Sequence, residues 1–354
     1  MEKYARFRYQ PCLPLGEDGT RVTASQKHIS LSRKAAGEGM VLIKNNNNAL
    51  PLASGEKIAL FGKATIEYIK GGGGSGDVHC PYIRNIFEGF KSKEKDGKVQ
   101  IYMPLIDFYK DYVEKESVHI PTQDQINATW DIVNAMEFCT KRDDMTYDTF
   151  ASMHVKEPAV PAELIKLASE WAHTAIITLS RFSAEGVDRR PQGGDYYLSD
   201  IEKDLITEAG KLFNKVVIVI NSGATIDCEF IAENDNVDGI LFGWQGGIEG
   251  GSAIADILCG DVNPSGKMAD TIAKSYDCYP CKEEFWESFK YIDYSDDIYV
   301  GYRYFETIPE AKKCVRYPFG FGLSYTQFEI SGRVCCESDG KIIAVATVKN
   351  IGSV

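Results

Sequence analysis

Short runs of consecutive apolar residues most constrain how this chain can fold. Five of them stand at residues 58–61, 99–102, 174–180, 216–221 and 239–242. Runs of this length with no polar alternation are typical of strands that are buried on both faces of a parallel sheet. Amphipathic stretches separate the runs. The sequence therefore predicts an α/β fold with a mostly parallel sheet.

Two helices can be predicted from their ends. Ser199 followed by Glu202 forms a capping box, and apolar residues then recur at helical spacing as far as Leu212. A second helix is expected at about residues 248–259, because Gly260 is a usual residue just past a helix C-terminus.

Two other segments differ from this alternation. Residues 107–161 are polar, aromatic and mostly helical in character, which predicts an excursion on the flank of the sheet. From residue 327 onward, two strand-like runs are joined by Ser-Asp-Gly, a hairpin signal. Because a hairpin cannot bury a sandwich core alone, we expect it to be the first part of a β domain.

Charge and composition exclude several classes of function. The chain has 51 acidic and 39 basic residues and a formal charge of −12, so it would repel nucleic acid. We find neither an apolar run near the ~18 residues of a membrane span nor a signal-like N-terminus, and therefore expect a cytoplasmic chain without a membrane partner. The ten cysteines are interpreted as free thiols. Cys278 and Cys281 form one CxxC without a second ligand pair, so no metal site is predicted.

A glycine-rich segment, KGGGGSGDVH at residues 70–79, contains the pattern GxGxxG. Dinucleotide-binding loops open a helix directly after a strand, whereas nine residues, 62–70, separate this pattern from the predicted strand. No bound cofactor is therefore predicted. Bare backbone at Gly74 and the hydroxyl of Ser75 could approach a ligand closely, and a tight structural turn is the alternative.

A long charged loop follows the predicted strand at residues 174–180. It extends over eighteen residues, 181–198, and loops this long in compact domains are often functional. It lies where a parallel sheet binds ligands, beyond the carboxyl end of a strand. A solvated loop with Arg–Asp pairs is an equally open interpretation. Its first fifteen residues include the ionisable side chains Arg181, Glu185, Asp188, Arg189, Arg190 and Asp195.

Several blocks of the sequence resemble glycoside hydrolase family 3, the β-glucosidase family. The resemblance extends over about residues 25–354 and implies a three-layer α/β/α sandwich at residues 25–320. It also implies an N-terminal arm at residues 1–24 and a truncated fibronectin-III-like domain at residues 321–354. The order suggests a permuted member whose TIM barrel lies downstream. The blocks are KAAGEGMVLIKNNNNALPL, KGGGGSGDV, SRFSAEGVDR, GWQGGIEGGSAIADILCGDVNPSGKMADT, IYVGYRYFE and YPFGFGLSYTQFE.

The resemblance also implies site residues. Glu185 would be the general acid/base of a retaining exo-acting β-glucosidase, and the nucleophile would belong to the barrel. Ser75, Gly74 and Arg181 would contact the sugar. Asp188 and Asp195 are expected to orient arginines rather than attack a sugar.

The expected substrates are β-linked oligosaccharides and aryl or alkyl β-glucosides. Two alternatives remain open: a β-xylosidase or other exo-β-glycosidase, and a non-catalytic saccharide-binding module. In the leading interpretation, the chain is nearly inactive without its barrel.

Overall fold

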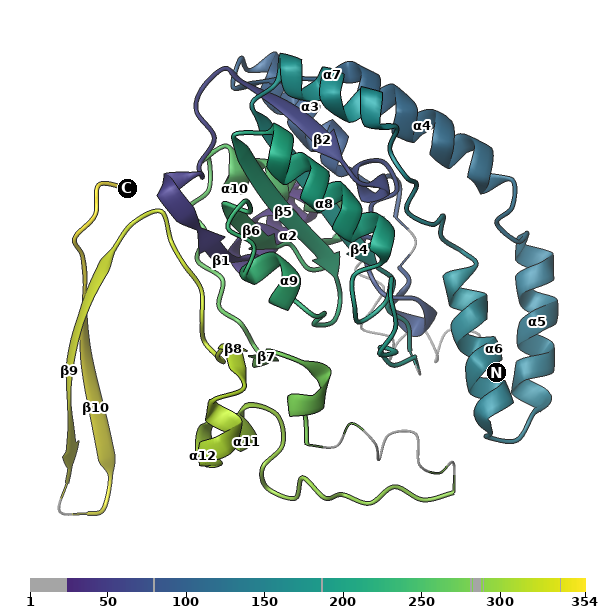
Figure 1. Cartoon of the computed structure of the whole chain (residues 1–354). Coiled ribbons are helices and arrows are strands. Elements are labelled where there is room, and N and C mark those ends of the chain that lie inside the picture. Colours follow the sequence, from purple (N-terminus) through teal and green to yellow (C-terminus); the bar gives the residue numbers. More distant parts are fainter. Residues whose placement is uncertain are drawn as a thin grey trace, which may run out of the picture.

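The computed structural model describes residues 24–354 except 79, 186, 281, 283–287, 289 and 338. Its centre is a six-stranded sheet in the order β1-β6-β5-β4-β2-β3, with helices on both faces (Figure 1). The five strands predicted from apolar runs are confirmed, and they are parallel to one another. The strands are β1 (Val41–Asn45), β2 (Glu56–Phe61), β3 (Val99–Ile101), β4 (Thr174–Arg181), β5 (Lys215–Ser222) and β6 (Gly239–Phe242).

The sixth strand, β1, is absent from the sequence prediction. It lies at the edge of the sheet and pairs antiparallel with β6, with Val41 opposite Phe242. Only its first three residues are buried. An apolar run this short carries little periodic signal, so its pairing partner decides its structure.

Helices form one layer on each face of the sheet. α4, α7, α8 and α9 contribute to one core cluster, and α3 and α10 to the other. The capped helix begins at Asp200 after the predicted Ser199–Glu202 capping box. The helices are α2 (Gln26–Gly39), α3 (Ile86–Lys95), α4 (Met103–Ser117), α5 (Gln123–Ala135), α6 (Thr140–Ala151), α7 (Ala162–Trp171), α8 (Asp200–Leu212), α9 (Glu229–Ala232), α10 (Gly250–Leu258), α11 (Tyr302–Thr307) and α12 (Pro309–Lys312).

Alternation along each strand divides the core between the two faces. In β2, Phe61 packs with the α4, α7 and α8 side, whereas Ile58 packs with α3 and α10. Both side chains are fully buried. Because apolar side chains are needed on both faces, the central strands β4 and β5 are buried along almost their whole length, whereas Gln100 in the edge strand β3 is exposed. The three-layer sandwich is thus confirmed.

The order of the strands creates a crevice at one end of the sheet. β2 pairs with β3 on one side and with β4 on the other, so the connection from β2 to β3 and the next one, from β3 to β4, run in opposite directions across the sheet. Parallel sheets bind ligands where this reversal occurs, beyond the carboxyl ends of the strands. The chain after β2 leads to the glycine-rich segment, and the chain after β4 leads to the charged loop.

Two regions lie outside the sandwich. α5 and α6 lie side by side beyond the sheet, so the helical character expected for residues 107–161 is confirmed (Figure 1). At the C-terminus, β9 and β10 form a projecting hairpin in which Phe328 pairs with Asn350. This hairpin is also confirmed, whereas its membership of a fibronectin-III-like domain stays a prediction. The remaining strands are β7 (Ile272–Ala273), β8 (Val315–Tyr317), β9 (Phe328–Cys336) and β10 (Ile342–Asn350).

No helix in the described ranges has the length and apolarity that crossing a membrane requires. The predicted N-terminal arm falls almost wholly on residues 1–23, which lie outside the described residues. Cys281 also lies outside them.

Candidate active site

The glycine-rich segment and the charged loop meet at the carboxyl ends of β2 and β4. The N–H of Gly73 donates to the carbonyl of Ser183 over 2.7 Å, and the N–H of Glu185 donates to the carbonyl of Gly73 over 3.3 Å. These bonds hold Glu185 directly against the glycine backbone. The two segments are about 110 residues apart in sequence, and the neighbouring strands β2 and β4 bring them together.

Close packing accounts for two of the glycines. Gly74 has a φ of +81°, and a Cβ there would lie 2.9 Å from the Cβ of Glu185. A Cβ at Gly73 would lie 2.5 Å from the ring of Phe150. Real Cβ atoms do not approach other atoms this closely, so both positions require glycine. The motif thus has a structural explanation that needs no nucleotide.

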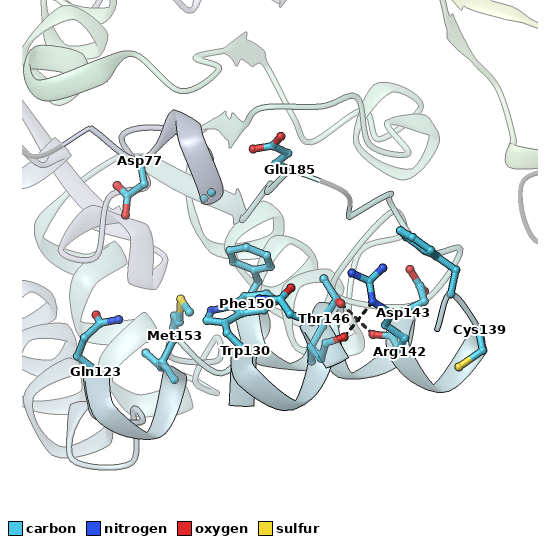
Figure 2. A pocket seen from close by; sticks show the side chains of 16 residues that line it. Asp77, Gln123, Trp130, Cys139, Arg142, Asp143, Thr146, Phe150, Met153 and Glu185 are labelled. Carbon is cyan, nitrogen blue, oxygen red and sulfur yellow. Dashed lines mark hydrogen bonds between the residues drawn. The ribbon is translucent and has the colours of Figure 1, made fainter. Parts of the chain in front are cut away.

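A cavity of about 670 Å³ opens beside these two segments. Glu185 lies on one side of it, and side chains of α5 and α6 form the other (Figure 2). Gly73 and Gly74, which contact the segment that carries Glu185, also line the cavity. Glu185 is exposed. Of the predicted site residues, Glu185 and Gly74 therefore come together here. Ser75 belongs to the same turn, Gly74–Gly76, and its side chain lies outside the described part of the structure.

Arg181 lies apart from this cavity, with its side chain only 4% exposed. Its guanidinium donates two hydrogen bonds to the carboxylate of Glu202, over 2.6 and 2.8 Å. Burial acts to raise the pKa of Glu202, but Arg181 and the capping N–H of Ser199 outweigh it and lower that pKa. Glu202 thus has two roles, because it caps α8 and also neutralises the charge of Arg181. Sequence reasoning assigned only the first role, and contact between Arg181 and sugar stays a prediction.

Asp195 links the charged loop to α6. Its carboxylate pairs with the guanidinium of Arg189 over 2.6 Å and accepts the N–H of Arg190 over 2.7 Å. The hydroxyl of Tyr147 on α6 donates to it over 2.9 Å. Burial, together with the charge of Asp195, raises the pKa of Tyr147 to about 12. The prediction that Asp195 orients an arginine is confirmed.

The contacts between α6 and the charged loop were not predicted from the sequence. Arg190 pairs with Asp143 over 3.0 Å and with Asp144 over 2.9 Å, and its guanidinium stacks on the ring of Tyr147 at 4.0 Å. Adjacent acidic residues on a polar helix are a weak signal on their own, because exposed helices often carry them.

A second polar cavity lies beneath the charged loop, between Lys63, His154, Glu157 and Glu202. Both carboxylate oxygens of Glu157 accept the N–H of Lys63, over 3.2 and 3.0 Å. Burial raises the pKa of Glu157 from 4.5 to about 7. Among the described residues, no group of three His, Cys, Asp or Glu side chains is arranged to hold a metal ion.

A family model and known proteins match most of the chain. Residues 40–325 match the model described as "Glycosyl hydrolase family 3 C-terminal domain". Beta-glucosidase A of Butyrivibrio fibrisolvens is 43% identical over 391 residues, covering 100% of this chain and 43% of the relative. A beta-glucosidase of Ruminococcus albus is 35% identical, covering 92% of this chain and 31% of the relative. The chain therefore spans less than half the length of these relatives.

Solved structures show the same fold. A beta-glucosidase of Paenibacillus barengoltzii superposes with a TM-score of 0.79 at 32% identity, covering 93% of this chain and 33% of that chain. Beta-glucosidase 3B of Thermotoga neapolitana, solved in complex with glucose, has a TM-score of 0.75 at 34% identity, covering 92% and 42%.

Proposed function

Because this chain belongs to glycosyl hydrolase family 3, we propose that it supplies the general acid/base, Glu185, of a retaining exo-acting β-glucosidase. The observation that carries the proposal is the position of Glu185. Its carboxylate lines the cavity at the switch point of the sheet, packed closely against the backbone of Gly74. An open carboxylate in this crevice is suited to transfer a proton to a bound substrate.

Two further acidic side chains line the cavity, and both lie in ion pairs. Asp77 pairs with Lys70 over 2.6 Å, and Asp143 pairs with Arg190 over 3.0 Å. These ion pairs hold the two carboxylates in the surrounding segments. Both pairs therefore help to hold the walls of the cavity in place.

The proposed reaction needs two carboxyl groups. In a retaining glycosidase, one donates a proton to the leaving oxygen, and the other, which lies about 5–5.5 Å from the first, attacks the sugar. The first then takes a proton from water as the glycosyl–enzyme intermediate is hydrolysed. We assign the first role to Glu185 and the second to a TIM-barrel domain outside this chain. The chain alone should be nearly inactive.

A general acid must hold a proton at the working pH. Desolvation and a nearby second carboxylate both raise the pKa of a carboxylic acid. Glu185 is exposed in this chain. In the proposed enzyme, both effects would arise when the barrel covers the crevice.

The substrate class follows from the relatives, which are named as beta-glucosidases. We propose terminal β-D-glucosyl residues as the substrate. A β-xylosidase or other exo-β-glycosidase is the second candidate, because the missing domain would hold much of the sugar ring. A saccharide-binding module without catalysis is the third.

The test uses a polypeptide that carries this chain together with the nucleophile domain. Glu185→Gln should reduce hydrolysis of an aryl β-glucoside by about 10²–10⁴-fold, the usual contribution of general acid–base catalysis. Glu170→Gln, at an exposed position on α7, is the matched control and should leave the rate unchanged. Undiminished hydrolysis in Glu185→Gln would refute the assignment. Faster cleavage of aryl β-xylosides than of β-glucosides would favour the second candidate.

A further inference from the structure

Two cysteines that are distant in sequence meet in a small cluster outside the main sheet. Cys278 ends the turn Tyr276–Cys278, which follows β7, and Cys314 lies directly before β8. The N–H of Lys274 donates to the carbonyl of Cys314 over 2.8 Å and so continues the pairing of β7 with β8. Figure 1 shows these two strands next to α11 and α12. Backbone hydrogen bonds therefore join the segments that carry the two thiols.

Both thiols also pack against one apolar core. Cys278 and Cys314 are partly buried side chains in contact with it. The core consists of Ala273 on β7, Phe305 on α11 and Ala311 on α12. Because neither cysteine is fully buried, a small molecule in solution can reach this pair.

The surroundings make the two thiols chemically unequal. Burial acts to raise the pKa of Cys278, but hydrogen bonds from Cys314 and Ser275 outweigh it and lower that pKa. The Oγ of Ser275 lies 3.4 Å from the Sγ of Cys278. The interaction with Cys278, together with burial, raises the pKa of Cys314. Since the thiolate is the nucleophilic form, Cys278 is the thiol that reacts first.

Four other cysteines of the described part are less suited to such a reaction. Cys228 is fully buried, and burial raises its pKa. Burial also raises the pKa of Cys259, to about 12. Cys335 and Cys336 are neighbours on β9, where successive side chains point to opposite faces and keep their sulfur atoms apart.

We propose that Cys278 and Cys314 form a redox-modification site, which a low-molecular-weight disulfide such as oxidised glutathione converts into an intramolecular disulfide. The thiolate of Cys278 attacks one sulfur of the small disulfide and expels the other half as a thiolate. Cys314 loses its proton, attacks the sulfur of Cys278 and releases the second half. The two protein thiols thereby lose two electrons, which reduce the small disulfide to two thiols. The two protons pass to these thiols.

The bridge would act on the surface against which the charged loop packs. Tyr276 and Tyr279, on either side of Cys278, meet the ring of Tyr196 in that loop at centroid distances of 5.4 and 6.5 Å. A covalent bond from Cys278 to the start of β8 would fix this aromatic contact. The inference does not depend on the proposed function.

The test maps disulfides in the polypeptide after anaerobic incubation with oxidised glutathione and alkylation of the remaining thiols. Trypsin should release Cys314 in the peptide CVR, and Cys278 together with Cys281 in SYDCYPCK. We expect a product that joins these two peptides and that dithiothreitol converts back to free thiols. Cys281→Ser should give the same product. The absence of a bridge, a bridge confined to SYDCYPCK, or loss of the joined peptides in Cys281→Ser would overturn the inference.

Two variants in the Cys281→Ser background test the order of the steps. With Cys314→Ser, the reaction should stop at a mixed disulfide between Cys278 and glutathione. With Cys278→Ser, the uptake of glutathione at this site should be about tenfold slower, because the more reactive thiolate is missing. Cys335→Ser, at an exposed position on β9, is the matched control and should leave the rate and the product unaltered. Equal uptake in Cys314→Ser and Cys278→Ser would contradict the assignment of Cys278 as the attacking thiol.

Discussion

The Arg181–Glu202 pair gives the sharpest test of how the charged loop is supported. Both side chains are 4% exposed, and the two groups share hydrogen bonds of 2.6 and 2.8 Å. Glu202→Gln removes the negative charge and one acceptor, leaving the guanidinium buried without neutralisation. Breaking a buried pair on one side costs about 3–5 kcal/mol, a large part of the ~5–15 kcal/mol that stabilises a typical domain. The free energy of unfolding should fall by that amount in urea denaturation followed by circular dichroism.

Two variants isolate the cause of this loss. Glu208→Gln makes the same change on the same helix, at an exposed residue that pairs with Lys211 over 2.6 Å, and should alter stability by less than about 0.5 kcal/mol. The double variant Arg181→Met/Glu202→Leu removes both charges and should be more stable than Glu202→Gln alone. The reasoning is refuted if Glu202→Gln unfolds with the wild-type midpoint.

Two further predictions concern pH and packing. Burial raises the pKa of Glu157 from 4.5 to about 7. Between these two pH values, the folded chain keeps a proton that the unfolded chain loses. The free energy of unfolding should therefore fall by about 3 kcal/mol as the pH rises from 4.5 to 7. Glu157→Gln should abolish this pH dependence of the unfolding free energy, measured by urea titrations at several pH values. An unchanged pH dependence would contradict the prediction. Gly251→Ala places a Cβ against the backbone carbonyl of Asn85 and should lower the free energy of unfolding by about 1–3 kcal/mol. Gly39→Ala, on α2, is the control: its Cβ would have no atom within 4 Å, so the change should be neutral or stabilising in the same assay. Equal effects at both glycines would argue against the packing explanation.

The sheet could be predicted from sequence because its signal is local. Residues 175–177 and 216–220 are apolar without interruption, and both lie within strands whose two faces are buried. The capping box of Ser199 and Glu202 is likewise contained in four residues. Strand β1 could not be found in this way, since its edge position and antiparallel pairing depend on β6, about 200 residues away.

The candidate site was only partly predictable. The charged loop was identified by its length and its place after a strand, and Glu185 by the resemblance to a family. The side of the cavity formed by α5 and α6 was not predicted, because Trp130 and Phe150, which line it, lie in a segment without a clear hydrophobic period. Nothing in their sequence neighbourhood indicates that they face Glu185. That juxtaposition arises from the contacts of α6 with Asp195 and Arg190, which are 40 or more residues away in sequence.

The charged loop also shows that two interpretations of a sequence can hold together. Arg–Asp pairs were the structural alternative to a functional loop, and the pair of Asp195 with Arg189 does form, but Asp195 is only 1% exposed. Removing charges from water costs free energy, so a buried pair of this kind adds little net stability. What it provides is a fixed geometry: Asp195 receives hydrogen bonds from Tyr147 on α6 and from the backbone of Arg190, and it pairs with Arg189. These contacts thus fix the charged loop against α6, while the backbone bonds with Gly73 hold Glu185 against the glycine-rich segment.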